Sequence, residues 1–278
     1  MSALHVRPTI GKFKPSKARH GGKAYHLASL LPSGARALVC LVKLLERPEM
    51  EKPILIEGLP GIGFVANIAA MHMIRELGGR RFALIKSSSF QDFAMTDKDG
   101  RLRSPINELY ACADRFIILY GNTQANDNVG QYELCGKILK LVRGMGCELV
   151  ITMGGYKRER LPRKPRVLCA ATDEELLEEA RRLCDGIILG NIYGAAGLLL
   201  GLGKLMGMRG VCFLAETLGL YPDPRAASEV LKVVSAFLGI EIDLTKLEQA
   251  AIVAEDMWRS LRPPEETRPP RKRGEGIV

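Results

Sequence analysis

The sequence has few of the residues that build metal sites and catalytic pairs. Its seven cysteines are never closer than twelve positions apart, so it has no CxxC pair of the kind that binds zinc. Three of its four histidines lie within the first 26 residues, which leaves His72 as the one histidine of the remaining chain. We therefore expect no metal, no cofactor and no histidine-based nucleophile pair.

Aromatic residues make up only 6% of the chain, whereas aliphatic residues are abundant, and this balance favours an α/β fold over an all-β sandwich. The eighteen residues 186–203 carry no charge, which is the minimum length of a membrane span. Each of their six glycines costs about 1 kcal/mol relative to alanine in a helix, so the stretch indicates a buried helix instead. Residues 1–30 lack the apolar segment of a secretory signal, and we expect a cytoplasmic protein with no membrane partner.

The net charge of +9 is concentrated at the two ends of the chain. Residues 1–49 carry +7 and residues 259–278 carry +3, so the body is close to neutral. A nucleic-acid-binding body is not indicated, although basic ends of this kind can touch RNA. We expect a basic, disordered leader over residues 1–49, with a short helical stretch at 35–45, and a flexible basic tail over residues 262–278. Met50 is an alternative start, because patterned sequence begins directly after it.

Short apolar runs alternate with amphipathic segments in the body of the chain. Strands are expected at 53–57, 81–86, 106–111, 115–119, 147–153, 167–171 and 211–215, with a hairpin at 91–103. Helices are expected at 64–77, 130–143, 172–184, 190–203, 225–238 and 243–261. This alternation predicts a single domain over residues 50–261, a three-layer α/β/α sandwich with a mostly parallel sheet.

The stretch 190–224 supplies the middle of this core. Gly197 and Gly201, four positions apart, indicate a helix whose backbone can lie close against a neighbour. The strand that follows ends at Glu216, and open α/β sheets place ligands and partner surfaces at such carboxyl ends. Asp223, directly before a proline, has the pattern of a helix start.

The segment Gly58-Leu-Pro-Gly-Ile-Gly63 joins a strand to a helix, an arrangement that can cradle phosphate. No Lys-Ser/Thr pair follows it, and Phe64 stands where the lysine might be, so it is not a Walker loop. A dinucleotide fold would also need a third glycine and an acid after the next strand, although Lys86 and the serines that follow it could suit a 2′-phosphate. The simpler interpretation is a tight turn that lets the helix close onto the sheet.

Three further features each have two interpretations. Six Lys or Arg residues between 157 and 166 form either a solvated loop, which we favour, or a contact for an acidic partner or RNA. His72 is interpreted as a helix-surface or core-edge residue rather than a catalytic base. Apolar residues repeat at 3-4 spacing from Leu244 to Leu261, and this seam packs either on the chain's own sheet or on another subunit.

Three groups of motif residues occur in order between about residues 52 and 247. They are Ile56 to Gly63; Gly121 to Gln124 with Gln131-Tyr-Glu133 and Met153 to Tyr156; and Gly190 to Gly197 with Leu214 to Thr217, Pro222-Asp223 and Arg225 to Ala227. Together they resemble the proteasome assembly chaperone 2 family in its archaeal single-domain form. The resemblance implies an α/β/α sandwich akin to the nucleoside phosphorylase fold, a homo-oligomer, and a role in helping proteasome subunits assemble.

The chain departs from this family at its end. Members that dock on the proteasome α-ring often end in hydrophobic-Tyr-any, whereas this chain ends in Gly276-Ile277-Val278, which puts that docking mode in doubt. Family members have also been described as resembling ATP-grasp ligases. The sequence has no phosphate lysine or metal-carboxylate cluster that would support ligase chemistry.

We therefore predict a non-catalytic, chaperone-like protein that assists proteasome assembly through protein–protein contacts, with α-type proteasome subunits and copies of itself as partners. The alternative is a nucleotide- or nucleoside-binding enzyme of phosphorylase-like or ATP-grasp-like type, in which the glycine loop would hold phosphate and Glu216 would act as base. RNA binding through the basic ends is a third interpretation. No catalytic residue is assigned, and the candidate binding residues are Gly58, Pro60, Gly61, Gly63, Gln124, Tyr132, Glu133, Gly154, Gly155, Asn191, Gly194, Glu216, Thr217 and Asp223.

Overall fold

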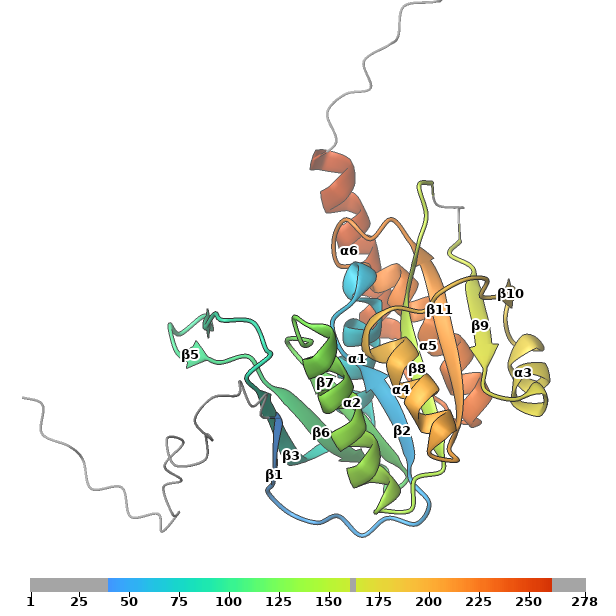
Figure 1. Cartoon of the computed structure of the whole chain (residues 1–278). Helices are drawn as coiled ribbons and strands as arrows, with labels where there is room; N and C mark the ends of the chain where they lie inside the picture. Colours follow the sequence, from blue (N-terminus) through green and yellow to red (C-terminus); the bar gives the residue numbers. More distant parts are fainter. Residues whose placement is uncertain (1–39, 161–163, 262–278) are drawn as a thin grey trace, which may run out of the picture. The chain divides into compact units, whose positions relative to one another are not determined.

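Runs of aliphatic residues form most of the strands in the computed structural model, which describes residues 40–160 and 164–261 and, for residues 255, 256 and 258–261, the backbone alone. The strands are β1 Cys40–Leu44, β2 Ile54–Gly58, β3 Arg80–Ser87, β4 Met95–Thr96, β5 Leu102–Arg103, β6 Asn107–Cys112, β7 Phe116–Gly121, β8 Leu149–Lys157, β9 Val167–Ala171, β10 Gly186–Ile187 and β11 Arg209–Thr217. Nine of them form one sheet in the order β1-β3-β6-β7-β2-β8-β11-β9-β10, and β4 pairs with β5 (Figure 1).

The nine-stranded sheet is mixed. β7, β2, β8 and β11 run parallel at its centre, but β6 is antiparallel to both β7 and β3, and β9 is antiparallel to β11. The prediction of a mostly parallel sheet is therefore wrong. Between β6 and β7, Ala113 and Asp114 turn the chain with φ angles of 48° and 49°. So short a connection joins antiparallel strands, whereas a parallel pair needs a long crossover.

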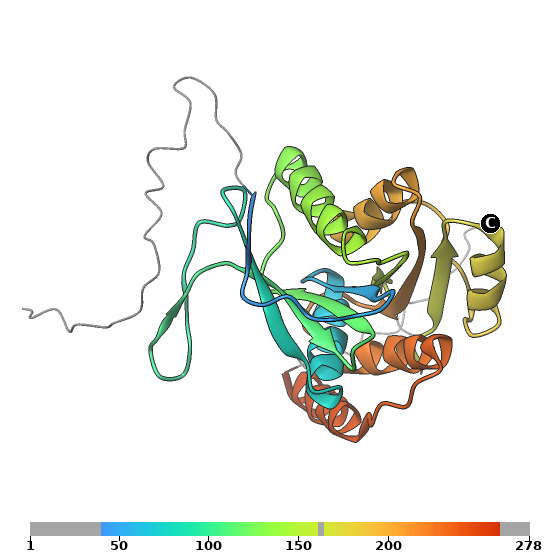
Figure 2. The ribbon, with the colours of Figure 1, turned by 90° about the horizontal axis from the view of Figure 1, so that it is seen from below.

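Helices cover both faces of the sheet (Figure 2). Within the described ranges the α-helices are α1 Val65–Glu76, α2 Asn128–Arg143, α3 Glu174–Arg181, α4 Gly194–Leu205, α5 Pro224–Leu238 and α6 Thr245–Leu261. One apolar cluster joins α1, α3, α5 and the start of α6 to one face, and a second joins α2 and α4 to the other face. The predicted α/β class is confirmed, and the likeness to the nucleoside phosphorylase fold stays a prediction.

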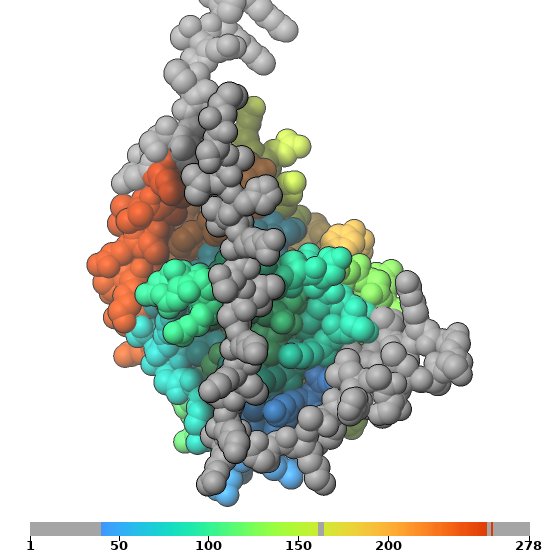
Figure 3. All heavy atoms as spheres, turned by 90° about the vertical axis from the view of Figure 1, so that its left-hand side faces the viewer, coloured from blue at the N-terminus to red at the C-terminus, as the bar shows by residue number. Residues whose placement is uncertain are grey.

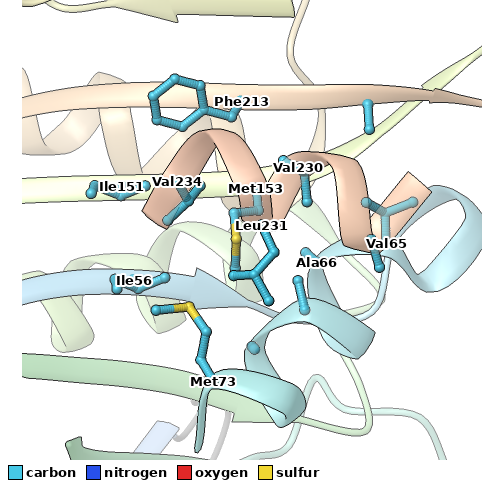
Figure 4. Close-up of a cluster of buried hydrophobic side chains, with 14 of the residues drawn as sticks. Ile56, Val65, Ala66, Met73, Ile151, Met153, Phe213, Val230, Leu231 and Val234 are labelled. Carbon is cyan, nitrogen blue, oxygen red and sulfur yellow. The ribbon is translucent and has the colours of Figure 1, made fainter. Parts of the chain in front are cut away.

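The central strands send apolar side chains to both faces. Ile56 of β2 and Met153 of β8 lie with Met73 of α1 in the first cluster (Figure 4). Leu55, next to Ile56 in the chain, and Val150, the ladder partner of Leu55, lie in the second cluster. Strands that are covered on both faces consist mainly of apolar residues, and this holds for β2 and β8. Burial of each such side chain contributes about 1.5–3 kcal/mol to the free energy of folding.

The sheet begins ahead of the domain boundary that we predict at residue 50. Residues 40–44 form the edge strand β1, where the sequence predicts a leader and, over 35–45, a helical stretch. The start at Met50 stays a prediction, and a chain that began there would lack this strand. The rest of the predicted leader, residues 1–39, and the predicted tail, residues 262–278, lie outside the described residues.

Contacts with α2 explain why these residues form a strand. The Cys40 amide donates to Oε1 of Glu133 at 3.1 Å, and Nζ of Lys137 donates to the Cys40 carbonyl. The same Lys137 lies 3.1 Å from the Glu133 carboxylate. Helix propensity differs by only tenths of a kcal/mol between ordinary residues, so these bonds and the ladder to β3 outweigh it.

The hairpin of β4 and β5 lies where the sequence predicts it. Oδ1 of Asp97 accepts hydrogen bonds from the amides of Asp99 and Arg101, each at 3.0 Å, and Gly100 has a φ of 75°. These are local contacts, so the turn residues alone indicate the hairpin. The hairpin and β1 lie on the side that faces the viewer in Figure 3.

The stretch 190–224 forms α4, β11 and the start of α5, as predicted. In the part of the chain that the structure describes, no helix is long and apolar enough to cross a membrane. A Cβ atom on Gly197 would lie 1.9 Å from the carbonyl oxygen of Ile192, whereas a Cβ atom on Gly201 would have nothing within 4 Å. Close backbone approach is therefore real at Gly197, where the helix meets its own preceding loop, and the prediction is wrong for Gly201.

The last helix packs on its own chain where its side chains are described. Leu247 is buried in the cluster formed with α1 and α5, and Leu244 packs beside it. The first half of the predicted seam therefore packs within its own chain, on the helical layer that contains α5, where the prediction named the sheet itself. The side chains of Trp258 and Leu261, in its second half, lie outside the described residues.

Gly58→Ala is expected to destabilise the protein by roughly 1–3 kcal/mol, because the added Cβ would lie 2.0 Å from Cβ of Ala70 and overpack α1 against β2. Gly61→Ala is the matched control, since its Cβ would have nothing within 4 Å and its φ of −152° suits alanine. That variant is expected to be unchanged or stabilised by about 0.4–1 kcal/mol. Urea unfolding followed by circular dichroism measures both, and equal stabilities would contradict the close contact at Gly58.

Candidate functional site

The carboxyl ends of β7, β2, β8 and β11 meet at one edge of the sheet, because these four strands are parallel. Such edges are where open α/β sheets place their functional loops. Hydrogen bonds and packing contacts at this edge bring together most of the predicted binding residues: Gly58, Pro60, Gly61, Gly63, Gln124, Gly154, Gly155, Gly194, Glu216, Thr217 and Asp223.

Three predicted binding residues lie apart from this group. Asn191 precedes α4 and is exposed, with Nδ2 3.1 Å from the hydroxyl of Tyr193. Tyr132 is exposed on α2. Glu133, next to it, bonds to β1, the outermost strand on one side of the sheet, and so lies away from the carboxyl ends of the central strands.

Gln124 joins three elements around the shared edge. Its Nε2 donates to the Pro60 carbonyl at 2.6 Å, and its Oε1 accepts from the amide of Ala195, in the first turn of α4, at 2.9 Å. The same Oε1 accepts from Nε2 of Gln131, on α2, at 2.8 Å. A Cβ atom on Gly194 would lie 3.0 Å from this oxygen. Gln124 therefore fixes the loop after β2 against two helices.

The loop after β2 also packs against β8, β11 and the start of α5. A Cβ atom on Gly63 would lie 2.9 Å from Oγ1 of Thr217, and one on Gly155 would lie 2.3 Å from the Ile62 carbonyl oxygen. Oγ1 of Thr217 donates to Oδ2 of Asp223 at 2.7 Å, and the Asp223 amide donates to the Gly63 carbonyl at 2.9 Å. Asp223 also caps α5, as predicted. These contacts within the chain support the tight-turn interpretation of the glycines.

Glu216 is buried, and two arginines neutralise it. Nε of Arg158 lies 2.9 Å from its Oε1, and Nη2 of Arg166 lies 2.8 Å from the same oxygen. Hydrogen bonding to Arg166 holds the pKa of Glu216 below its usual range, and this effect exceeds the opposing effect of burial. A carboxylate with a lowered pKa is a weak base, so Glu216 is poorly suited to the base role of the enzyme alternative.

The described basic residues of segment 157–166 are exposed, as the favoured solvated-loop interpretation predicts, but some of them also have partners within the chain. Arg158 and Arg166 both pair with Glu216, and Nζ of Lys164 lies 3.1 Å from the carboxylate of Glu229, on α5. These three side chains are exposed to solvent, as predicted, and each also forms an ion pair within the chain. Their partners are distant in the sequence, so nothing local indicates the pairing.

Glu57, at the end of β2, is a buried acid that the sequence analysis does not single out. It is 2% exposed, its Oε1 accepts from the Leu59 amide at 2.8 Å, and its Oε2 has no hydrogen-bond partner among the described residues. Burial raises the pKa of Glu57 to about 8, against the smaller opposing effect of the Leu59 amide. The carboxyl group is therefore mostly neutral at pH 7. One acid inside an otherwise aliphatic strand is the signal that could have identified it.

Asn67 is a second polar residue that the sequence analysis misses. Its Nδ2, on α1, donates to the carbonyls of Gly58 at 3.0 Å and Gly121 at 2.8 Å. It thus joins the ends of β2 and β7. A cavity of about 440 Å³ opens beside it between α1 and α6. His72 borders this cavity at the edge of the core, as predicted, with Nε2 2.7 Å from the Asp243 carbonyl oxygen.

Apolar side chains are exposed on the loops that these contacts fix. Ile62 and Phe64 follow β2, Leu220 follows β11, and their exposed fractions are 44%, 45% and 74%. A Cβ atom on Gly219 would lie 2.7 Å from Cγ2 of Ile62, so the two loops touch. We call Ile62, Phe64 and Leu220 the apolar rim. Exposed apolar groups on a fixed support are typical of surfaces that bind other proteins.

Comparison with known proteins finds a matching family and several similar structures. The profile of the PAC2 family matches residues 55–261. A protein of Methanocaldococcus jannaschii, named as uncharacterized, is 35% identical over 226 residues, which cover 77% of this chain and 86% of that protein. The crystal structure of Pyrococcus furiosus PbaB, described as an archaeal proteasome activator, is 40% identical, with a TM-score of 0.76 and coverage of 80% of this chain and 98% of that chain. Pyrococcus furiosus PbaA, described as an archaeal homolog of proteasome-assembly chaperone, is 28% identical, with a TM-score of 0.67 and coverage of 79% and 96%.

Gln124→Ala is expected to lower the free energy of unfolding by roughly 2–3 kcal/mol, because three hydrogen bonds are lost and their buried partners are left unpaired. Asn191→Ala is the matched control, since its amide bonds only at the exposed surface, and it is expected to change stability by less than about 0.5 kcal/mol. Scanning calorimetry measures both. A Gln124→Ala protein as stable as the control would show that the loop does not depend on this side chain.

The free energy of unfolding is expected to fall as pH rises from 4.5, the ordinary pKa of glutamate, to about 8, the pKa of folded Glu57. Within this window the unfolded chain releases a proton that the folded chain keeps, which costs roughly 1.4 kcal/mol per pH unit. Below the window Glu57 is protonated in both the folded and the unfolded chain, and above it Glu57 is ionised in both. Glu57→Gln keeps the shape and stays neutral, so we expect it to lose this slope and to be more stable than wild type at alkaline pH. Denaturant unfolding across the window tests this, and parallel pH profiles for the two proteins would contradict it.

Proposed function

Because the chain belongs to the PAC2 family, we propose that it is a non-catalytic, chaperone-like protein that assists proteasome assembly through protein–protein contacts. Its proposed partners are α-type proteasome subunits and further copies of itself, in the cytoplasm. The descriptions of PbaB as a proteasome activator and of PbaA as a homolog of proteasome-assembly chaperone support this proposal.

The apolar rim is the observation that carries the proposal. Ile62, Phe64 and Leu220 expose apolar surface, while the polar groups beside them bond within the chain. A partner that covered the rim would bury apolar area without first having to order these loops.

The same contacts disfavour the alternative of a nucleotide- or nucleoside-binding enzyme. Glu216, the proposed base, is held by Arg158 and Arg166. The glycines of the loop after β2 face protein atoms at Gly58 and Gly63, which leaves less of the loop to approach a phosphate. Thermal unfolding with a panel of nucleotides and nucleosides tests the alternative, since a ligand at about 100 times its dissociation constant stabilises a protein by about 2.7 kcal/mol.

The double substitution Ile62→Glu and Leu220→Glu places charges on the apolar rim and is expected to weaken binding to α-type proteasome subunits at least about tenfold. Leu205→Glu is the matched control. Leu205 is 85% exposed at the far end of α4, next to the start of β11, and so lies at the opposite edge of the sheet. The full chain and both variants are compared by surface plasmon resonance at low salt.

The two outcomes of this experiment are distinct. If the wild-type protein does not bind α-type subunits, the proposed function fails. If the rim variant binds as tightly as wild type and the control, the function stands but its contact surface lies elsewhere. Circular dichroism of the variants confirms that the substitutions at these exposed positions leave the fold intact.

A further inference from the structure

The cavity beside Asn67 is bounded by α1, by α6 and by Tyr120, near the end of β7. Both helices cover the same face of the sheet, and α6 packs mainly on α5 (Figure 2). A space of about 440 Å³ therefore remains between α6 and α1. This volume lies within the range of sites that hold small molecules, roughly 300–1,000 Å³.

Contacts between the two helices hold the walls of this cavity. Nε2 of His72, on α1, lies 2.7 Å from the carbonyl oxygen of Asp243, just before α6. Nζ of Lys246 lies 3.4 Å from Oε1 of Glu76. Leu247 is buried in the apolar cluster that α6 shares with α1 and α5. The cavity is therefore largely preformed, as binding sites for small molecules usually are.

Apolar side chains form one part of the lining. Ile68 and Met71 come from α1, and Leu247 and Ala250 come from α6. Ile68 and Met71 are half-buried, so each keeps apolar surface that a bound molecule can cover. Removal of such surface from water favours binding. A ligand for this cavity therefore needs an apolar body.

Two polar side chains in the same lining are unengaged. The guanidinium of Arg75 makes no hydrogen bond or ion pair with any residue that the structure describes. The hydroxyl of Tyr120 likewise has no hydrogen-bond partner within the described ranges. Burial raises the pKa of Tyr120, and the positive charge of Arg75 only partly opposes this effect. The hydroxyl is therefore protonated at neutral pH and can donate a hydrogen bond.

The charges of the lining indicate what the polar end of a ligand should be. Arg75, Lys246 and Glu76 are the charged residues around the cavity, and Lys246 pairs with Glu76. One positive charge, on Arg75, is thus left uncompensated. Its planar guanidinium matches a carboxylate, which it can bind through two parallel hydrogen bonds. A single uncompensated charge suits such a monoanion better than a phosphate group, which carries a charge of about −1.5 to −2.

We propose that this cavity is a binding site for a small monocarboxylic acid with an apolar body. The carboxylate would bond to Arg75 and to the hydroxyl of Tyr120, while the apolar body would lie on the side chains of Ile68, Met71 and Leu247. Because the ligand touches both helices, it would hold α6 more firmly against α1. The inference is independent of the proposed function, since the cavity and the apolar rim are formed by different residues.

Octanoate is the probe for this site, and 1-octanol, which has the same apolar body without the charge, is its matched control. The full chain is labelled at its methyl groups and titrated with each compound in an NMR experiment. We expect octanoate to shift the methyl signals of Ile68, Met71 and Leu247, and to leave those of Ile62 and Leu220 on the apolar rim unchanged. Octanol should bind at least about tenfold more weakly, because it cannot pair with the guanidinium.

Variants test the polar end of the site. Arg75 is exposed, so its substitution should leave the fold intact, and Arg75→Gln is expected to weaken octanoate binding at least about tenfold. Arg75→Lys keeps the charge without the planar fork and should bind with intermediate affinity. Tyr120→Phe should weaken binding roughly two- to tenfold. Arg143→Gln removes an exposed arginine from α2, on the other face of the sheet, and should bind as wild type does.

The proposal is overturned if octanoate shifts none of the three cavity methyl signals, or if the Arg75→Gln protein binds it as tightly as wild type does. Equal binding of octanol and octanoate would also overturn it, because the site would then recognise apolar bodies alone. Displacement of octanoate by an equal concentration of inorganic phosphate would show that the site takes phosphate rather than carboxylate, and would overturn it as well. These measurements involve no proteasome subunit, so their failure would leave the proposed function standing.

Discussion

Ile56 and Ile151 contact the helices on one face of the sheet, while Leu55 and Val150, beside them, contact the helices on the other face. This burial on both faces requires the central strands to be apolar along their length, and their amides and carbonyls bond within the ladder. Polar side chains are therefore confined almost entirely to the strand ends. Thr152, buried in the middle of β8, is an exception. Glu57, at the end of β2, stays neutral at pH 7 because burial raises its pKa. The position of the polar cluster at one edge of the sheet follows from this constraint.

At that edge the polar groups bond mainly to one another. Gln124 satisfies a carbonyl of the loop after β2 and an amide of α4, and Thr217 bonds to Asp223, which also caps a helix. Glu216 takes its two counter-ions from the segment after β8. Groups engaged in this way hold the loops still. The bonds among these polar groups thus hold the loops at the carboxyl ends of the central strands, and the same loops expose the apolar rim.

The sequence allows prediction of the elements that depend on local pattern. A few consecutive residues are enough to predict several elements. These are the aliphatic strands β2 and β8, the hairpin turn at Asp97 and the helix cap at Asp223. Features that depend on distant partners cannot be predicted in this way. β1 forms because it pairs with β3 and bonds to Glu133. Glu216 is neutralised by Arg158 and Arg166, which are distant from it in the sequence. The motif glycines could be located, but what each of them touches became clear only with the fold.

The edge strand β1 has one further consequence for how the protein behaves among other chains. It occupies the outer side of β3, a strand of eight residues that would otherwise present a row of unpaired amides and carbonyls. Open edges of that length are templates for strand addition and aggregation. A shorter form of the chain that began at Met50 would keep most of the apolar interior, losing Cys40 and Val42 from the second cluster, and would leave the outer side of β3 unpaired. The five residues 40–44 therefore act mainly by covering the open side of β3 against strand addition, and they contribute little to the buried core.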